Sequence, residues 1–434
     1  MRDPIYKSRP VEPNPARLGG ERINDFIVLS EGFSNSYLIE TSEGNIQLNA
    51  GMGFEAPVHK RNFESFSSSP VVYLILTQGH TDHVGGVGYF RRQYPDMKVI
   101  AQAGNQEHQA YDQRLAEFRR NRSGFAFINK FMDIFRYYAE QGLTEYPEQD
   151  VPVPDITFED RLNFTLGGLD IELIAVPGAE TNDSLIAWLP QHKICFAGNL
   201  FGCPFGHFPN LVTIRGDRYR DALTVANAVQ TVLDLDAEMI LYGHHHPVMG
   251  KESIREELTC LRDAIRYVHD ETVKGMNEGK DVHTLMAEIQ LPPELEVGQG
   301  YGKVSWSVRA IWENYSGWFH HQSTTELYAV PQQSVHADLI ELAGGPGALV
   351  EKAREKLANE QYEQAIHLLD IAMSAPGTNI DAIDVAISTH EALLKNSVNF
   401  WLSSWLKNQI EQLNTRKNAG ESGSVSRVST PGRN

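Results

Sequence analysis

Short apolar runs alternate with amphipathic segments along the first 250 or so residues of the chain. Runs of three to seven residues that are rich in apolar side chains predict buried strands. Amphipathic segments with helical spacing separate some of them, at 84–93, 104–119 and 218–233. Strands that alternate with helices indicate a layered α/β domain. The predicted strands are 26–29, 36–40, 46–48, 70–76, 99–102, 171–176, 184–189, 193–197 and 237–242.

After Gly250 the pattern becomes helical. We expect four parts: an extended N-terminal arm (1–20), an α/β domain with a helical extension (21–315), a helical domain (316–415) and a disordered tail (416–434). Residues 120–155 are aromatic and polar with a proline-rich end, which is typical of a lid or of a dimer contact. The helices predicted after Gly250 are 253–277, 281–288, 304–315, 347–359, 361–374, 380–395 and 398–411.

Composition narrows the class of protein. The formal net charge is −18 and 41% of the residues are hydrophobic, so we expect a globular protein that binds neither nucleic acid nor anionic membrane. Three cysteines without a C-x-x-C pair indicate no disulfide framework. No apolar run reaches the length of a membrane span, and the N-terminus lacks the apolar centre of a signal peptide. The expected compartment is the cytoplasm.

Side chains that bind metals follow three of the predicted strands. The stretch 74–86 reads L-I-L-T-Q-G-H-T-D-H-V-G-G, and it places His80, Asp82 and His83 within four positions. Glu180 follows a Pro-Gly turn, and a run of three histidines begins at His244. Imidazole and carboxylate ligands in such density suit zinc or iron. The sequence therefore predicts a metal site.

These motifs, in this order, resemble the metallo-β-lactamase superfamily and in particular its alkylsulfatase branch. The resemblance covers nearly the whole chain, including the stretches 189–199 and 244–250 and the helical segment 267–291. It implies an αββα sandwich followed by an all-helical dimerisation domain, whose entry resembles Gly317-Trp318 and 341–345. The sterol-carrier-like third domain of many such enzymes has no expected counterpart in this sequence.

Compared position by position, the resemblance implies an altered metal site. The family's H-x-H-x-D-H reads Q-G-H-T-D-H at 78–83, so that Gln78 replaces a histidine. Gly198, in A-G-N, stands where the family has a second glutamate. One metal position keeps Asp82, His83 and His244, with His245 as a neighbouring candidate. The other keeps His80 and Glu180 with Gln78. We expect one firmly bound Zn²⁺ and a second ion that is weak, replaced or absent; iron and manganese are alternatives.

The resemblance also implies substrate-binding residues. Asn210 and Arg215 have the spacing of the asparagine and arginine that hold sulfate in alkylsulfatases, and an amide with a guanidinium suits an oxyanion. The alternative is an Arg215 that pairs with Asp217 at the surface. His207 is a candidate general acid, or a packed side chain.

The predicted function is a metal-dependent hydrolase that uses a metal-bound hydroxide, with Asp82 orienting it, to cleave a sulfate ester or a similar ester or ether of a small organic molecule. Four aromatic residues, Trp188, Phe201, Phe205 and Phe208, are expected to pack against the organic group. Alternatives are cleavage of an aromatic ether or carboxylic ester, or a non-catalytic subunit of a hetero-oligomeric hydrolase; β-lactam or thioester hydrolysis fits the helical part less well. We expect a homo- or hetero-oligomer formed through the C-terminal helices.

Overall fold

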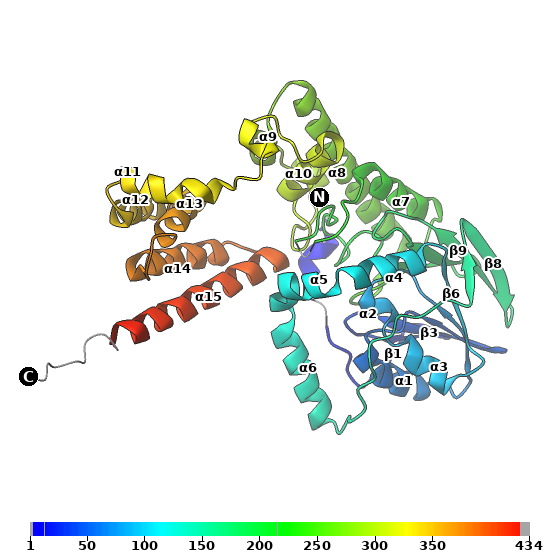
Figure 1. Ribbon diagram of the computed structural model, residues 1–434. Helices are drawn as coiled ribbons and strands as arrows, with labels where there is room; N and C mark the ends of the chain where they lie inside the picture. The colour runs from blue at the N-terminus through cyan, green and yellow to red at the C-terminus, as the bar shows by residue number, and fades with distance from the viewer. Residues whose placement is uncertain (1–2, 13, 215, 426–434) are drawn as a thin grey trace, which may run out of the picture. The chain divides into compact units, whose positions relative to one another are not determined.

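The computed structural model describes residues 3–12, 14–214 and 216–425, with side chains up to 419. Two compact units meet in sequence between Trp318 and Phe319, three residues after the expected boundary. The first unit contains two β-sheets with helices around them, and the second is helical (Figure 1).

A seven-stranded sheet follows the order of the sequence from β1 to β7. Strands β1 to β4 pair antiparallel, whereas β4, β5, β6 and β7 are parallel neighbours. The parallel part needs crossover connections, and helices supply them. The strands are β1 (Glu21–Arg22), β2 (Ile27–Ser30), β3 (Ser36–Thr41), β4 (Gly44–Leu48), β5 (Val71–Ile75), β6 (Lys98–Gln102) and β7 (Ile156–Phe158).

A six-stranded sheet has the order β13-β12-β11-β10-β9-β8. The predicted strands 184–189 and 193–197 are β10 and β11, which pair antiparallel, and β11 is parallel to β12. The strands are β8 (Arg161–Leu166), β9 (Leu169–Ala175), β10 (Leu185–Leu189), β11 (Ile194–Gly198), β12 (Met239–Tyr242) and β13 (Val248–Met249).

Alternating side chains join the layers. In β10, Leu185 and Ala187 belong to the core between the two sheets, while Ile186 and Trp188 face the helical layer. The outer face of the seven-stranded sheet carries α1 (Ala56–Glu64) and α3 (Val87–Gln93). The other sheet carries α7 (Ala222–Asp234), α8 (Lys251–Asn277) and α10 (Val304–Ser316). The predicted αββα sandwich is therefore confirmed.

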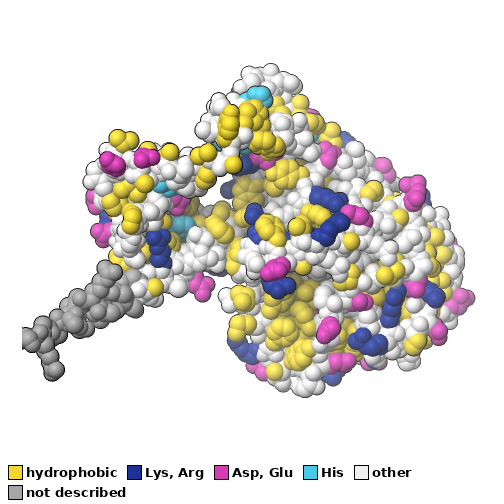
Figure 2. Space-filling model, viewed as in Figure 1, with side chains coloured by type: hydrophobic (Ala, Val, Ile, Leu, Met, Phe, Trp, Pro, Cys, Tyr) yellow, Lys and Arg dark blue, Asp and Glu magenta, His cyan; other side chains and the backbone are white. Residues whose placement is uncertain are grey.

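Three helices stand between β6 and β7, where the pattern predicted one. The expected helix 104–119 is broken at Leu115 into α4 (Asn105–Arg114) and α5 (Ala116–Ser123). The additional helix α6 (Ile128–Glu140) buries Ile134 and Tyr138. Figure 2 shows hydrophobic side chains gathered along α6, where Ile128, Met132 and Phe135 are exposed.

The N-terminal arm is held against the first unit. A 3₁₀ turn at Ile5–Ser8 begins with an Ile5 N–H that donates to Glu257 Oε1 (2.9 Å). The Tyr6 hydroxyl donates to Glu296 Oε1 (2.6 Å), and Arg9 donates to the carbonyl oxygens of His246 and Pro247. The arm is thus fixed by hydrogen bonds to α8 and to two loops.

The second unit is built from helix pairs around a small apolar core. Val350, Ala353, Ala365 and Leu369 are buried in it. The last helix runs to Val425, not to the expected end at Glu411, so 416–425 is helical where a disordered tail was predicted; 426–434 lie outside the described residues. Over the described residues, no helix combines the length and apolarity that crossing a bilayer requires. The helices are α11 (His336–Leu342), α12 (Pro346–Ala358), α13 (Tyr362–Met373), α14 (Ile380–Lys395) and α15 (Phe400–Val425). The first unit also contains the short helix α9 (Val282–Glu288).

Candidate metal centre

Three predicted ligands meet where strands of the two sheets end. β5 leads into the one-turn helix α2 (Thr81–Val84), which carries Asp82 and His83, and His244 follows β12. One ligand atom of each lies within 4.8 Å of the other two. Asp82 Oδ2 is 3.6 Å from His83 Nε2 and 3.9 Å from His244 Nε2. Two imidazoles and a carboxylate around one point match a catalytic zinc set, which keeps a fourth position open.

Hydrogen bonds orient the His83 ring. Asn199 Nδ2, which can only donate, is 3.0 Å from His83 Nε2, so Nε2 is the acceptor. The ring proton is therefore on Nδ1, which lies 2.9 Å from Ser34 Oγ. The ring is therefore neutral with Nε2 unprotonated, and Nε2 becomes a metal ligand when the hydrogen bond from Asn199 is exchanged for a bond to the metal.

Burial keeps both histidines neutral. Desolvation lowers the pKa of His83 to about 3. It also lowers the pKa of His244 to about 3, although the charge of Asp82 acts in the opposite direction. Because an imidazole must be unprotonated to ligate, both rings are available at pH 7. The residues present fit one metal ion.

The His244 loop is fixed from the opposite sheet. Asn35, at the turn before β3, donates from its side chain to the carbonyl oxygens of Tyr242 (3.1 Å) and His245 (2.7 Å). Its backbone N–H donates to Gly243 O (2.6 Å). A Cβ at Gly243 would lie 2.0 Å from Asn199 Oδ1, so only glycine fits there. The loop and the Asn199 side chain are thus packed as one piece.

The second expected metal position is not assembled in the same way. Gln78 Oε1 accepts from the Asn199 N–H (3.3 Å), and Gln78 Nε2 lies 2.7 Å from His80 Nδ1. Glu180 Oε1 is 3.9 Å from that Nδ1, but only 3.0 Å from Arg220 Nη2. Among the described residues, His80 and Glu180 are not part of the group of clustered metal-ligand atoms.

His245 is turned away from that group. It has a positive φ of 61° and is buried, and its Nδ1 lies 3.7 Å from Glu31 Oε1. The nearby His245 imidazole is the main reason that the pKa of Glu31 is lowered. The structure therefore separates His245 from His244 although they are adjacent in sequence.

The residues expected to bind substrate have different environments. Asn210 is buried, and its carbonyl oxygen accepts from Arg220 Nη1 (2.6 Å). Arg215 lies outside the described residues. His207 accepts from the Gly300 N–H at Nδ1 (2.9 Å), packs edge-on against Tyr6, and has a pKa lowered to about 4 by burial. A neutral, packed imidazole matches the second interpretation of His207; its catalytic role stays a prediction.

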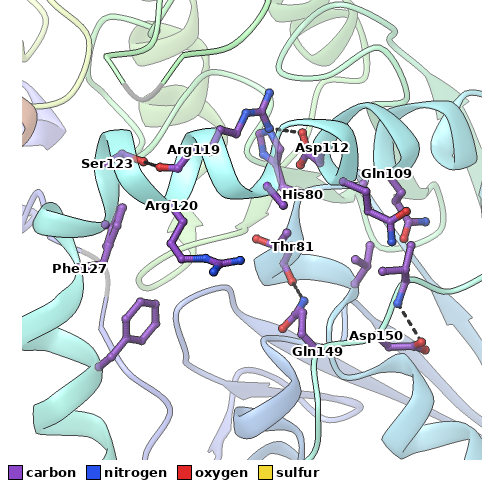
Figure 3. Close-up of a pocket in the computed structure, with 17 residues that line it drawn as sticks. His80, Thr81, Gln109, Asp112, Arg119, Arg120, Ser123, Phe127, Gln149 and Asp150 are labelled. Carbon is purple, nitrogen blue, oxygen red and sulfur yellow. Dashed lines mark hydrogen bonds and ion pairs between the residues drawn. The ribbon is translucent and has the colours of Figure 1, made fainter.

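A cavity of about 440 Å³ begins beside α2. His80 and Thr81, the two residues before Asp82, line it, and α4 to α6 form much of its wall (Figure 3). Phe127 and Phe131 make one side apolar, and Arg120 points into the space (Figure 3). The 120–155 segment therefore forms part of a wall, which agrees with its interpretation as a lid.

The four aromatic residues expected to pack against substrate are instead in the hydrophobic core. Trp188, Phe201, Phe205 and Phe208 are all buried in the layer between the six-stranded sheet and its helices. That expectation was wrong, because the loop after β11 folds inward with its three phenylalanines, and Trp188 packs from β10 into the same core.

Sequence reasoning missed the polar residues that hold the ligands. Ser34 and Asn35 lie in a loop whose sequence has no recognisable site motif, and Arg220 lies near the start of the predicted helix 218–233. Asn199 stood in the A-G-N motif, so its position beside the site could have been inferred from its neighbour. All four act through contacts between residues far apart in sequence.

Comparisons with known proteins agree with this architecture. Residues 29–244 match the model of the metallo-β-lactamase superfamily, and residues 281–415 match that of alkyl sulfatase dimerisation. The chain is homologous to alkylsulfatases. It joins a metallo-β-lactamase domain to an alkylsulfatase dimerisation domain, and the expected hydrolase family is confirmed.

Individual relatives have low sequence identity to this chain but align with most of its length. A linear primary-alkylsulfatase of a Pseudomonas species is 26% identical over 86% of this chain and 73% of its own length. An alkyl/aryl-sulfatase of Saccharomyces cerevisiae is 23% identical over 79% of this chain and 55% of its own length. The solved structure of a stereoselective inverting sec-alkylsulfatase of a Pseudomonas species has a TM-score of 0.77 and 22% identity, and covers 91% of this chain and 66% of that one. The chain thus spans about half to three quarters of its relatives' lengths.

Proposed function

We propose that this alkylsulfatase homologue hydrolyses sulfate esters of small organic alcohols, and that the reaction depends on one metal ion held by Asp82, His83 and His244. The observation that carries the proposal is the three-ligand group, whose two histidines are buried, beside a cavity with apolar walls. Zinc is the proposed ion because two imidazoles and a carboxylate suit it.

We assign different roles to the aspartate and to the two histidines of the proposed site. A divalent ion bound there supplies Lewis acidity and lowers the pKa of coordinated water. The Asp82 side chain is 23% exposed, while those of His83 and His244 are nearly buried. We therefore assign to Asp82 the orientation of the attacking water and the acceptance of its proton. His83 and His244 hold their positions as neutral bases.

The cavity supplies the binding energy for the organic group. Phe127, Phe131 and Val84 line it with apolar surface. No carboxylate lies within ion-pair distance of Arg120 in the part of the chain that the structure describes, so its charge is available to attract an anion into this acidic protein. The proposed anchors of the sulfate itself are Asn210 and Arg215, and His207 receives no step in this mechanism.

The test is release of inorganic sulfate from a linear alkyl sulfate by the full chain reconstituted with zinc. We expect turnover in the wild type and a loss of at least 100-fold in Asp82→Asn, because the ligand charge and the proton acceptor are both removed. His246→Ala is the control, since His246 is exposed and pairs with Glu21 instead of the site. Turnover of a carboxylic ester but not of a sulfate ester would favour the alternative hydrolase, and turnover of neither would favour a non-catalytic subunit.

A further inference from the structure

We propose that Arg220 takes the place of a second metal ion, so that this chain works with a single ion. The inference rests on the proposed metal site at Asp82, His83 and His244, and it concerns the neighbouring position formed by Gln78, His80 and Glu180. Residues resembling a second ligand set are still present there, but their ligand atoms are already used by other groups.

Arg220 is a buried cation with fixed partners. Its side chain is 6% exposed. Nη2 contacts Glu180 Oε1 at 3.0 Å, and Nε donates to the Glu180 carbonyl oxygen at 2.7 Å. Nη1 donates to Asn210 O at 2.6 Å, and Nη2 also lies 3.8 Å from Asp217 Oδ2. The guanidinium thus binds the carboxylate that a second ion would need.

The imidazole of His80 is engaged as well. Because Gln78 Oε1 accepts from the Asn199 N–H, the amide nitrogen of Gln78 must face His80 Nδ1 and donate to it. The ring proton is then on Nε2, which lies 3.9 Å from Asp217 Oδ2. In this arrangement neither ring nitrogen of His80 presents a free lone pair to an ion.

The carboxylates near this position already have guanidinium partners. Asp112, Glu180 and Asp217 are linked by ion pairs to Arg119 and Arg220. A guanidinium keeps its charge at every physiological pH. A divalent ion next to Glu180 would be repelled by Arg220, or would have to displace it at the cost of leaving a buried charge unpaired.

Gly198 stands where the family resemblance expects the glutamate that would join two ions. Gly198 has φ +53°, and a Cβ there would lie 2.7 Å from Thr77 Oγ1. A longer side chain at this position would meet strain as well as a clash. The loss of the bridging residue and the presence of Arg220 therefore point to the same conclusion: one ion and one fixed cation.

The experiment counts Co²⁺ ions per full-length chain by titration, with the coupling between adjacent ions read by electron paramagnetic resonance. We expect one ion and no spin coupling in the wild type. In Gln78→His/Arg220→Gln, which restores an imidazole and removes the guanidinium, we expect a second ion and coupled spins. The matched control is Gln78→His/Arg218→Gln, because Arg218 is an exposed neighbour that pairs with Glu107, and it should stay at one ion.

The outcomes separate this proposal from the proposed function. Two ions in the wild type would overturn the role of Arg220 and leave a metal-dependent hydrolase intact. One ion in both the wild type and a folded Arg220 variant would also overturn it. No ion in the wild type would overturn both proposals. If circular dichroism shows that the double variant is unfolded, Arg220→Lys, which keeps the charge, should fold and still bind one ion; two ions there would contradict the proposal.

Discussion

The Asp82–His83–His244 site depends on buried residues that are neutral or held by hydrogen bonds. Desolvation keeps the imidazoles of His83 and His244 unprotonated at pH 7. The tautomer of His83 is set by Ser34 on one side and Asn199 on the other. Metal binding by His83 therefore depends on residues that hydrogen-bond to the ligand and do not contact the metal themselves.

The Ser34 hydroxyl is predicted to hold the His83 imidazole in the orientation that binds metal. Ser34→Ala removes the acceptor of the His83 Nδ1 proton, so the ring loses its fixed orientation. We expect a 10- to 100-fold loss of zinc affinity, measured by competition with a chelating dye. Ser36→Ala is the matched control, since Ser36 is a nearby buried serine whose hydroxyl donates to Asn49 O and not to a histidine. Equal affinity in wild type and Ser34→Ala would show that the hydrogen bond has no such role.

The sequence pointed to the candidate ligands that the structure brings together, but not to the residues around them. Asp82, His83 and His244 could be found because their residue types and their spacing after strands are specific. Arg220 could not, since an arginine at a helix start is usually a surface residue, and only the fold brings it to Glu180. For His245 the adjacent position was misleading, because a positive φ turns it toward Glu31.

At the scale of elements, the site is placed by strand ends and enclosed by helices. β5, β9, β11 and β12 each lead into a loop that carries a site residue. Their apolar, β-branched runs made most of them predictable from sequence. α6 was missed because large hydrophobic residues lie on its exposed face as well as on its buried face.

The prediction for these elements concerns the apolar wall. Phe127→Ala should raise KM for a twelve-carbon alkyl sulfate by about tenfold, because losing contact with one aromatic ring costs about 1–2 kcal/mol. KM for a two-carbon sulfate should change little, and kcat should stay similar for both. Phe118→Ala is the control: this ring on α5 is exposed and does not line the cavity. An equal effect on both substrates would exclude the cavity as the binding site of the chain.

On the scale of the whole molecule, the chain consists of two units with separate cores. We expected a division after residue 315, and the structure divides the chain after Trp318. The sequence did not predict the length of α15, since the Gly- and Ser-containing end looked disordered. The match to an alkyl sulfatase dimerisation model in 281–415 indicates an oligomer.

We propose self-association through the second unit. Its exposed apolar side chains include Leu342 (84% exposed) and Trp405 (42%), and such surface is usually covered by a partner. Light scattering of the purified full chain should give twice the mass of one chain. A single-chain mass at micromolar concentration would contradict homodimerisation and favour a hetero-oligomer with a paralogue.

The most direct test of the central claim is the metal content of protein purified without added metal, for the wild type, His83→Ala and the control His246→Ala. We predict about one zinc per chain in the wild type and in the control, and almost none in His83→Ala, because Nε2 of His83 is one of the three proposed ligands. Absence of metal from the wild type, or an undiminished content in His83→Ala, would contradict the account.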